Sequence, residues 1–154
     1  MIKLDEIASG FSYVGSSVKE CNIHNSIIGL GSDAQYSLEL DFSTGLLPLN
    51  EEDSFRRGRV LLTIGCKVTS EADEDAKTDI DFIIEGEFSV SSEMSDEAFT
   101  KMLMVNGVSA LYGIARSKLE VITALTYHQG KISFPMINVL ELLKEKQKQE
   151  SQKN

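Results

Sequence analysis

The sequence predicts an α+β fold, in which a four-stranded antiparallel sheet carries two C-terminal helices packed on one face. Before residue 95, apolar and polar side chains alternate with period two over several segments, which places them on opposite faces of strands. After residue 95, apolar residues recur at the spacing of a helix. A chain of 154 residues fits one domain, and we expect that domain to span 1–146, followed by a mobile polar tail at 147–154.

Three segments alternate clearly, and a fourth does so weakly. Residues 36–42, 59–69 and 79–90 each place apolar side chains on one face, and the opposite face of the third segment is acidic. Residues 18–24 mix the two classes of side chain, which suggests an edge strand. We therefore expect one apolar and one acidic sheet face, a pattern typical of antiparallel strands. Cys66 falls on the apolar face and is predicted to be a core residue.

Two kinds of connection stand out between these segments. One is an acidic run that predicts a solvated hairpin turn, made of Glu71, Asp73, Glu74 and Asp75. The other kind is apolar, with Ile27, Ile28 and Leu30 before the first clear strand and Leu47 and Leu49 after it. Loops seldom expose such residues, so they are either tucked under the sheet or form a binding surface.

Helical signals begin at Ser95, a suitable N-cap that two acidic residues follow in the first turn. A continuous helix from there to residue 128 would be about 50 Å long, which is too long for a globule of this size. The Asn-Gly pair at 106–107 supplies a break. We therefore expect a short helix, a main helix over 108–127 that Gly130 ends, and a second helix over 137–146.

The main helix is apolar over a wider arc than one sheet requires. Its apolar residues span about 200°, whereas a stripe of roughly 100° is enough to cover a sheet. The excess forms a second sector, which consists of Ala110, Ile114, Val121 and Leu125. Either the second helix covers part of this sector or the chain self-associates there, and we expect a homo-oligomer that uses it.

Charge and composition exclude several classes of partner. The 24 Asp and Glu residues exceed the 15 Lys and Arg residues, and the net charge of -9 lacks the basic field that attracts nucleic acid. The longest uncharged stretch, 102–115, is shorter than a bilayer requires, and Asp5 and Glu6 disfavour a signal peptide. Two cysteines suit a reducing compartment. We expect a cytoplasmic protein with no nucleic-acid partner and no membrane insertion.

The sequence carries no recognisable catalytic or metal-binding motif. Cys21 and His24 have the spacing of a metal-ligand pair, but two ligands do not make a site and no second pair is present. Nucleotide-binding fingerprints and the nucleophile elbow of hydrolases are also absent. We therefore expect no enzymatic activity, no cofactor and no metal.

Several segments resemble the SecB family of export chaperones. The strand in which the family has Phe-Ser-Ile is similar to residues 86–90 (GEFSV). The family's Leu-Phe-Pro-Tyr-Ala-Arg helix and the Pro-Pro-Ile-Asn-Phe segment before its last helix are similar to residues 111–116 (LYGIAR) and 135–139 (PMINV). Residues 18–23 (VKECNI) match the family's first strand faintly, and the order of elements agrees across 18–146.

The resemblance implies a cytosolic chaperone that holds unfolded polypeptides without ATP and assembles as a dimer of dimers. It implies client-binding grooves formed here by Ile27, Ile28 and Leu30 on a loop and by Val139, Leu140, Leu142 and Leu143 on the last helix. It also implies an acidic surface for a SecA-type translocase motor, formed by Asp79, Asp81 and Glu85. The alternative that the apolar residues belong simply to the core stays open.

Two other functions are compatible with the sequence. Related SecB-like chaperones guard antitoxins or other dedicated clients, so a chaperone or adaptor dedicated to one partner is an alternative to a role in export. The tail at 144–154 is not acidic, which does not favour docking of a motor through the tail. A small-ligand-binding oligomer that uses a cavity between the layers is the third candidate.

Overall fold

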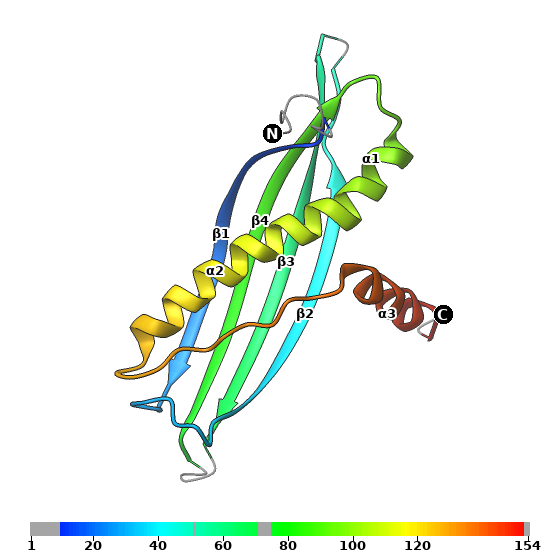
Figure 1. Ribbon diagram of the computed structural model, residues 1–154. Coiled ribbons are helices and arrows are strands. Elements are labelled where there is room, and N and C mark those ends of the chain that lie inside the picture. The colour runs from blue at the N-terminus through cyan, green and yellow to red at the C-terminus, as the bar shows by residue number, and fades with distance from the viewer. Residues whose placement is uncertain (1–9, 51, 71–74, 153–154) are drawn as a thin grey trace, which may run out of the picture.

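The computed structural model describes residues 10–50, 52–70 and 75–152 and has the predicted fold class. The elements are β1 (Ser12–Asn25), β2 (Gln35–Leu46), β3 (Phe55–Thr69), β4 (Lys77–Ser91), α1 (Asp96–Met102), η2 (Leu103–Gly107), α2 (Val108–Thr126) and α3 (Val139–Gln152). The strands form one antiparallel sheet in the order β1-β4-β3-β2. α2 crosses one face of this sheet diagonally, and α3 lies beside its β2 edge (Figure 1).

The sheet buries one face, as its alternating pattern predicts. Leu62 of β3 stands opposite Ile84 of β4, and Ile64 stands opposite Phe82, so that all four side chains point into one core. This inner face continues along both strands through Val60, Cys66, Val68, Ile80, Phe88 and Val90, all of which are buried. The prediction that Cys66 is a core residue is confirmed.

Each strand is longer than its alternation predicts, and β1 is the clearest case. It begins at Ser12, well before the predicted start. Register irregularities between Tyr13 and Gly15 and between Val18 and Glu20 interrupt the period-two pattern of side chains here, but they do not end the strand. The edge position predicted for 18–24 is confirmed. In the predicted acidic turn between β3 and β4, Glu71, Asp73 and Glu74 lie outside the described residues, and Asp75 lies just before β4.

The predicted break at 106–107 is wrong, because the chain stays helical from Asp96 to Thr126 through the π-helical turn η2. The length is accommodated because the sheet is itself long. β4 has 15 residues, which at about 3.3 Å per residue span about 50 Å. The predicted N-cap is confirmed, since Ser95 Oγ accepts a hydrogen bond of 3.3 Å from the Ala98 amide.

Close contact with the sheet explains the glycine of the Asn-Gly pair. A Cβ atom added to Gly107 would lie 2.9 Å from Val60 Cγ2, and one added to Gly86 would lie 2.8 Å from Leu111 Cδ1. These two glycines let the helix approach β3 and β4, so Gly107 serves packing and does not terminate a helix. The main helix ends at Thr126, before the predicted glycine, and Gly130 instead makes a turn with φ of 88° against Leu30.

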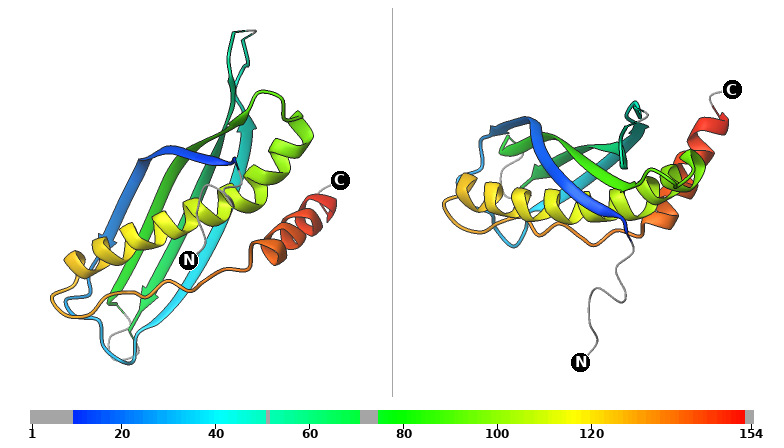
Figure 2. Two further views of the ribbon diagram at one scale, coloured as in Figure 1. Left: turned by 45° about the horizontal axis from the view of Figure 1, so that its top comes forward. Right: turned by 90° about the horizontal axis from the view of Figure 1, so that it is seen from above.

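After α2 the chain runs back across the inner face as an extended segment, residues 127–138, before α3 begins (Figures 1 and 2). Ile132 and Phe134 of this segment are buried in the core. α3 continues to Gln152, past the predicted end at residue 146, so helix extends into the predicted tail. It leaves Val121 and Leu125 exposed, and the alternative that the second helix covers the second sector of the main helix is therefore wrong for these residues. Within the described ranges, no helix is both long enough and apolar enough to cross a membrane.

Candidate functional site

A groove of about 370 Å³ lies where α3 meets β2 and η2. Its lining consists of Phe42, Ser43, Thr44, Met104, Leu143, Lys146 and Gln147. Phe42 is buried, Met104 and Leu143 are partly buried against the core, and polar side chains surround this apolar base. We call this hollow the α3 groove.

Two local features of the backbone position the walls of the α3 groove. In the π-helical turn, Leu103 is fully buried in the core while its neighbour Met104 lines the groove. At the start of α3, Asn138 Oδ1 accepts hydrogen bonds from the amides of Leu140 and Glu141, at 3.1 and 3.3 Å. This side-chain cap fixes where the helix begins and therefore where Leu143 falls.

Lys146 attaches α3 to the edge strand. Its Nζ atom lies 2.7 Å from Asp41 Oδ1, donates to the Phe42 carbonyl, and sits 4.5 Å from the centroid of the Phe42 ring. Lys144 and Lys148, by contrast, pair with Glu141 and Glu145 within the helix. Within the part of the chain that the structure describes, Lys146 is therefore the one lysine of α3 that bonds outside its own helix.

The predicted client-binding residues of α3 divide between core and surface. Val139 is buried, Leu142 and Leu143 are partly buried, and Leu140 is 58% exposed. On the predicted loop, Ile27 is buried, Leu30 is partly buried, and Ile28 is 81% exposed. The core alternative therefore holds for Ile27 and Val139, whereas Ile28 and Leu140 are accessible to a partner.

The structure does not bring the predicted loop and α3 together. The loop lies at the end of the sheet where α2 stops, whereas α3 lies farther along the β2 edge (Figures 1 and 2). The extended segment joins these two places, and its Met136 is 79% exposed. We call Ile28, Met136 and Leu140 the apolar track, because they lie on the loop, on the extended segment and on the first turn of α3.

Backbone hydrogen bonds hold the loop against the start of the extended segment. The Leu30 amide donates to the Gln129 carbonyl at 2.9 Å, and the His128 amide donates to the Ile28 carbonyl at 2.7 Å. Asn25 Nδ2 donates to the Ile27 carbonyl at 2.8 Å, which helps to turn Ile27 into the core. The Ile28 side chain therefore projects from a fixed backbone.

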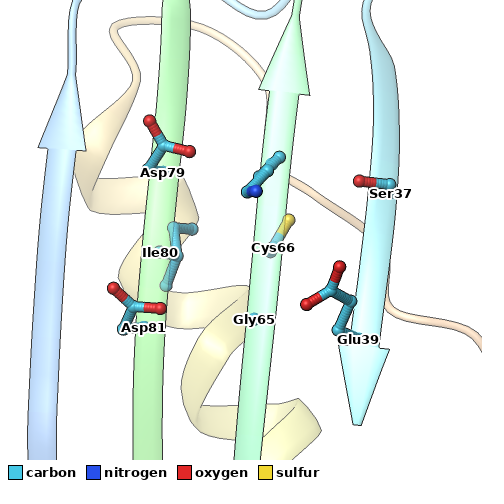
Figure 3. Close-up of a pocket in the computed structure, with 8 residues that line it drawn as sticks. Ser37, Glu39, Gly65, Cys66, Asp79, Ile80 and Asp81 are labelled. Atoms are coloured by element: carbon cyan, nitrogen blue, oxygen red, sulfur yellow. The ribbon is translucent and has the colours of Figure 1, made fainter.

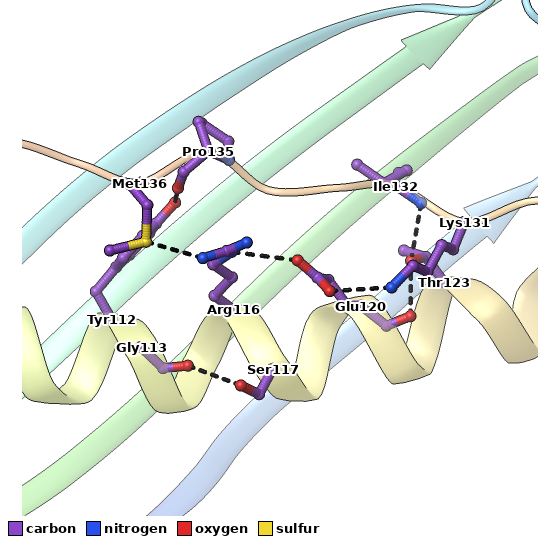
Figure 4. A network of polar contacts seen from close by, with 10 residues as sticks. All are labelled: Tyr112, Gly113, Arg116, Ser117, Glu120, Thr123, Lys131, Ile132, Pro135 and Met136. Atoms are coloured by element: carbon purple, nitrogen blue, oxygen red, sulfur yellow. Dashed lines mark hydrogen bonds and ion pairs between the residues drawn. The ribbon is translucent and has the colours of Figure 1, made fainter.

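A polar network fixes the extended segment to α2 (Figure 4). The Tyr112 hydroxyl donates to the Pro135 carbonyl at 2.7 Å, and the Ile132 amide donates to Thr123 Oγ1 at 3.2 Å. Glu120 accepts from Arg116 and Lys131 at 3.2 and 3.1 Å. The hydrogen bond from Lys131 lowers the pKa of the Glu120 carboxyl, and burial raises the pKa of the Tyr112 hydroxyl. Both groups are therefore held in the protonation states that these bonds require.

Arg116 extends this network to the surface, where its Nη1 atom lies 2.8 Å from Met136 Sδ. The guanidinium thus bridges Glu120 and the exposed methionine of the apolar track. Met136, Met104 and Phe42 were not among the residues predicted for the site. Only the Met136 position carried a signal in the sequence, since it lies in the PMINV segment.

The predicted acidic surface lies on the outer face of the sheet. Asp79 and Asp81 point from β4 toward a shallow hollow of about 280 Å³, and Glu39 faces it from β2 (Figure 3). Glu85 lies elsewhere on this face and is paired with Lys19 at 3.0 Å and with Arg59 at 4.0 Å. Asp79 and Asp81 share the hollow with Lys67, and Glu85 pairs with its own basic neighbours, so basic side chains accompany all three predicted acids.

The remaining candidates for chemistry are the two cysteine thiols and clusters of side chains that could bind a metal. Burial, with a contribution from Asp79, raises the pKa of the Cys66 thiol to about 11, so this thiol stays protonated at neutral pH. Cys21 is exposed. Among the described residues, no group of three or more His, Cys, Asp or Glu side chains could hold a metal ion.

The second sector of the main helix is largely open to solvent in the single chain. Ala110, Val121 and Leu125 are exposed, and Ile114 is partly buried. The sheet lies on the other side of α2, where Leu111, Ala115 and Leu119 are fully buried. The structure thus separates the two sectors as the helical spacing predicts.

No family model and no curated protein sequence matches this chain. Among solved structures, the fold is similar to that of the SecB-like chaperone Rv1957 of Mycobacterium tuberculosis, in a complex with a ChAD peptide from the Rv1956 HigA1 antitoxin. The TM-score is 0.62 at 13% sequence identity, and the match covers 87% of this chain and 95% of that chain. The chain therefore has a SecB-like fold.

Proposed function

We propose that this protein is a holdase chaperone, which binds non-native polypeptides in the cytoplasm without using ATP. The apolar track is the observation that carries this proposal, since Ile28, Met136 and Leu140 expose 81%, 79% and 58% of their surface. Exposed apolar side chains are typical of an interaction surface. Leu140 lies on the same helix as Leu143 of the α3 groove, and Ile28 lies against the start of the extended segment. The similar M. tuberculosis chaperone holds an antitoxin peptide, which supports a polypeptide as the class of client.

Clients bind through several weak apolar contacts. Burial of apolar surface contributes about 25 cal/mol per Å², so one side chain contributes about 1 to 2 kcal/mol. An extended client that meets the apolar track and the α3 groove makes several such contacts on one chain. Their combined effect gives useful affinity without requiring a particular client sequence.

Oligomer formation through the main helix is the second part of the proposal. Each chain is one domain, and four chains form a dimer of dimers in which Ala110, Ile114, Val121 and Leu125 meet a second copy. The exposure of most of this sector in the single chain supports such an interface. An oligomer also multiplies the apolar tracks available to one long client.

A client range restricted to one partner is the alternative. The antitoxin peptide in the similar structure favours it over delivery of exported proteins to a SecA-type motor, for which the chain offers Asp79 and Asp81 with Glu85 apart from them. A competition experiment distinguishes a general client range from one restricted to a single partner. Unrelated unfolded peptides displace a bound client from a general holdase and leave it bound to a dedicated one.

The proposal is tested by following the light scattering of a chemically unfolded protein after dilution from denaturant. We expect this protein to suppress aggregation at about one oligomer per client, with and without ATP. An equal mass of serum albumin is the control for nonspecific protection. Unchanged scattering at a several-fold excess of oligomer would show that the protein is not a holdase.

A further inference from the structure

The α3 groove combines an apolar base with a cation at its mouth. Phe42, Met104 and Leu143 form the apolar part, and Lys146 stands beside them. The lysine side chain is only 28% exposed, and its Nζ atom is held over the Phe42 ring and against the Phe42 carbonyl. The charge is therefore fixed in place before any ligand arrives, so little side-chain entropy remains to be lost on binding.

The anion that faces Lys146 is accessible to solvent. The Asp41 side chain is 76% exposed, and its Oδ1 atom accepts from both Lys146 Nζ at 2.7 Å and the Phe42 amide at 2.8 Å. An ion pair with one partner exposed in this way contributes little to stability. A carboxylate from another chain can take the place of Asp41 beside Lys146 when the Asp41 side chain turns away, which also breaks its bond to the Phe42 amide.

The distribution of charge along the chain favours an acidic ligand on this side of the sheet. Among the described residues, 95–152 contain seven Lys and Arg and six Asp and Glu, which gives a net charge of +1. The described residues before 95 contain six Lys and Arg and twelve Asp and Glu, which gives a net charge of -6. The part that forms the strands therefore repels acidic client segments more than the helical part does.

We infer that the α3 groove selects client segments in which an apolar side chain is followed or preceded by an acidic residue. The apolar side chain enters between Phe42, Met104 and Leu143, and the side-chain carboxylate binds Lys146 in place of Asp41. This inference rests on the proposed holdase function and adds a preference among clients. Lys146 is then a specificity-determining residue, and Asp41 is a built-in competitor for it.

The preference is measured with labelled peptides of about 12 residues that share one apolar core and differ at a single flanking position, which carries Glu, Gln or Lys. Their C-termini are amidated so that the terminal carboxylate cannot substitute for the side chain. Fluorescence anisotropy with the intact protein gives each Kd. We expect the Glu peptide to bind about three- to tenfold tighter than the Gln peptide, and the Lys peptide to bind weakest. Raising the salt concentration reduces these differences.

Two substitutions, one of a groove residue and one of its ion-pair partner, have opposite expected effects. Lys146→Met keeps an apolar stem but removes the charge, and it abolishes the preference for Glu over Gln. Asp41→Asn removes the competing carboxylate, retains an acceptor for the Phe42 amide, and tightens binding of the Glu peptide about twofold or more. Lys144→Met is the matched control, because this lysine pairs within α3, and it leaves the preference unchanged. Circular dichroism confirms that each variant is folded.

The possible outcomes separate this inference from the function on which it rests. Equal binding of the three peptides to the wild-type protein overturns the preference and leaves the holdase function standing. A preference for Glu that persists in Lys146→Met overturns the role of this lysine. If none of the peptides binds, the proposed function and the inference fail together.

Discussion

In two pairs of adjacent apolar residues, one member belongs to the core and the other faces solvent. Ile27 is buried and Ile28 is exposed, and the same holds for Val139 and Leu140. Sequence reasoning placed all four in one client-binding set, because apolar residues on a loop or helix look alike without a contact partner. Hydrogen bonds from Asn25 and to Asn138 fix which member of each pair faces the core.

The two cysteines are expected to differ sharply in reactivity. Burial raises the pKa of Cys66 to about 11, whereas Cys21 is exposed on the edge strand. A thiol reagent at pH 7.5 should therefore modify Cys21 rapidly and Cys66 only after denaturation. Absorbance at the reagent's leaving-group band counts the thiols, and Cys21→Ser is the control. Rapid modification of two thiols in the native wild-type protein contradicts the burial of Cys66.

Glu120 gives a pH-dependent contribution to stability with a defined sign. Its pKa in the folded protein is lowered below the ordinary value of 4.5, chiefly by the hydrogen bond from Lys131. A lowered pKa means that the stabilisation is present above the unfolded-state pKa and is lost as the pH falls through the folded-state pKa. We expect Glu120→Gln to be less stable than wild type at pH 7 and to approach it at acidic pH. Urea unfolding at several pH values measures this, and a gap that stays constant down to acidic pH contradicts the account.

At the scale of elements, glycines in the long helix have different roles that one substitution series can separate. Gly107→Ala places a Cβ atom 2.9 Å from Val60 Cγ2, whereas Gly113 has no atom within 4 Å of such a Cβ. We expect Gly107→Ala to destabilise the fold by about 1 to 3 kcal/mol through overpacking. Gly113→Ala should stabilise it by about 0.5 to 1 kcal/mol through helix propensity. Chemical denaturation measures both, and equal effects of the two substitutions would contradict close approach at Gly107.

The strands could be predicted from the sequence, but the continuity of the helix through residues 106–107 could not. Burial alternates so regularly along β3 and β4 that local pattern is sufficient there. The Asn-Gly pair looks like a helix end, and only the position of Val60 on another element shows that this glycine serves close packing. β1 was shortened in the prediction because its register irregularities hide the alternation.

At the scale of the whole molecule, the exposed second sector of α2 predicts that copies of the chain associate through this surface. Leu125→Asp places a charge on a side chain that is exposed in the single chain, so the monomer should still fold. If this sector is buried between copies, the substitution lowers the oligomer mass, because an unpaired buried charge is costly. Multi-angle light scattering measures the mass, and Thr63→Asp on the outer sheet face is the control. An unchanged mass for Leu125→Asp contradicts this interface.

The α3 groove could not be predicted from the sequence, because distant parts of the chain form it. Lys146 bonds Phe42, which lies 104 residues earlier, and Met104 enters through a π-helical turn that no local signal indicated. The general region was nevertheless expected, since Leu143 was among the predicted residues. Sequence pattern thus identified one wall of the site, and tertiary contact supplied the others.

Direct binding of an unfolded protein tests the central claim, that the apolar track receives clients. The measurement is a titration of a fluorescently labelled, permanently unfolded protein with the wild type and with the Ile28→Ser, Leu140→Ser double variant. Both side chains are exposed, so the double variant should retain its unfolding free energy to within about 0.5 kcal/mol per site. We predict that wild type binds and that the double variant binds at least tenfold more weakly. Equal affinity of the two proteins, both fully folded, would contradict the account.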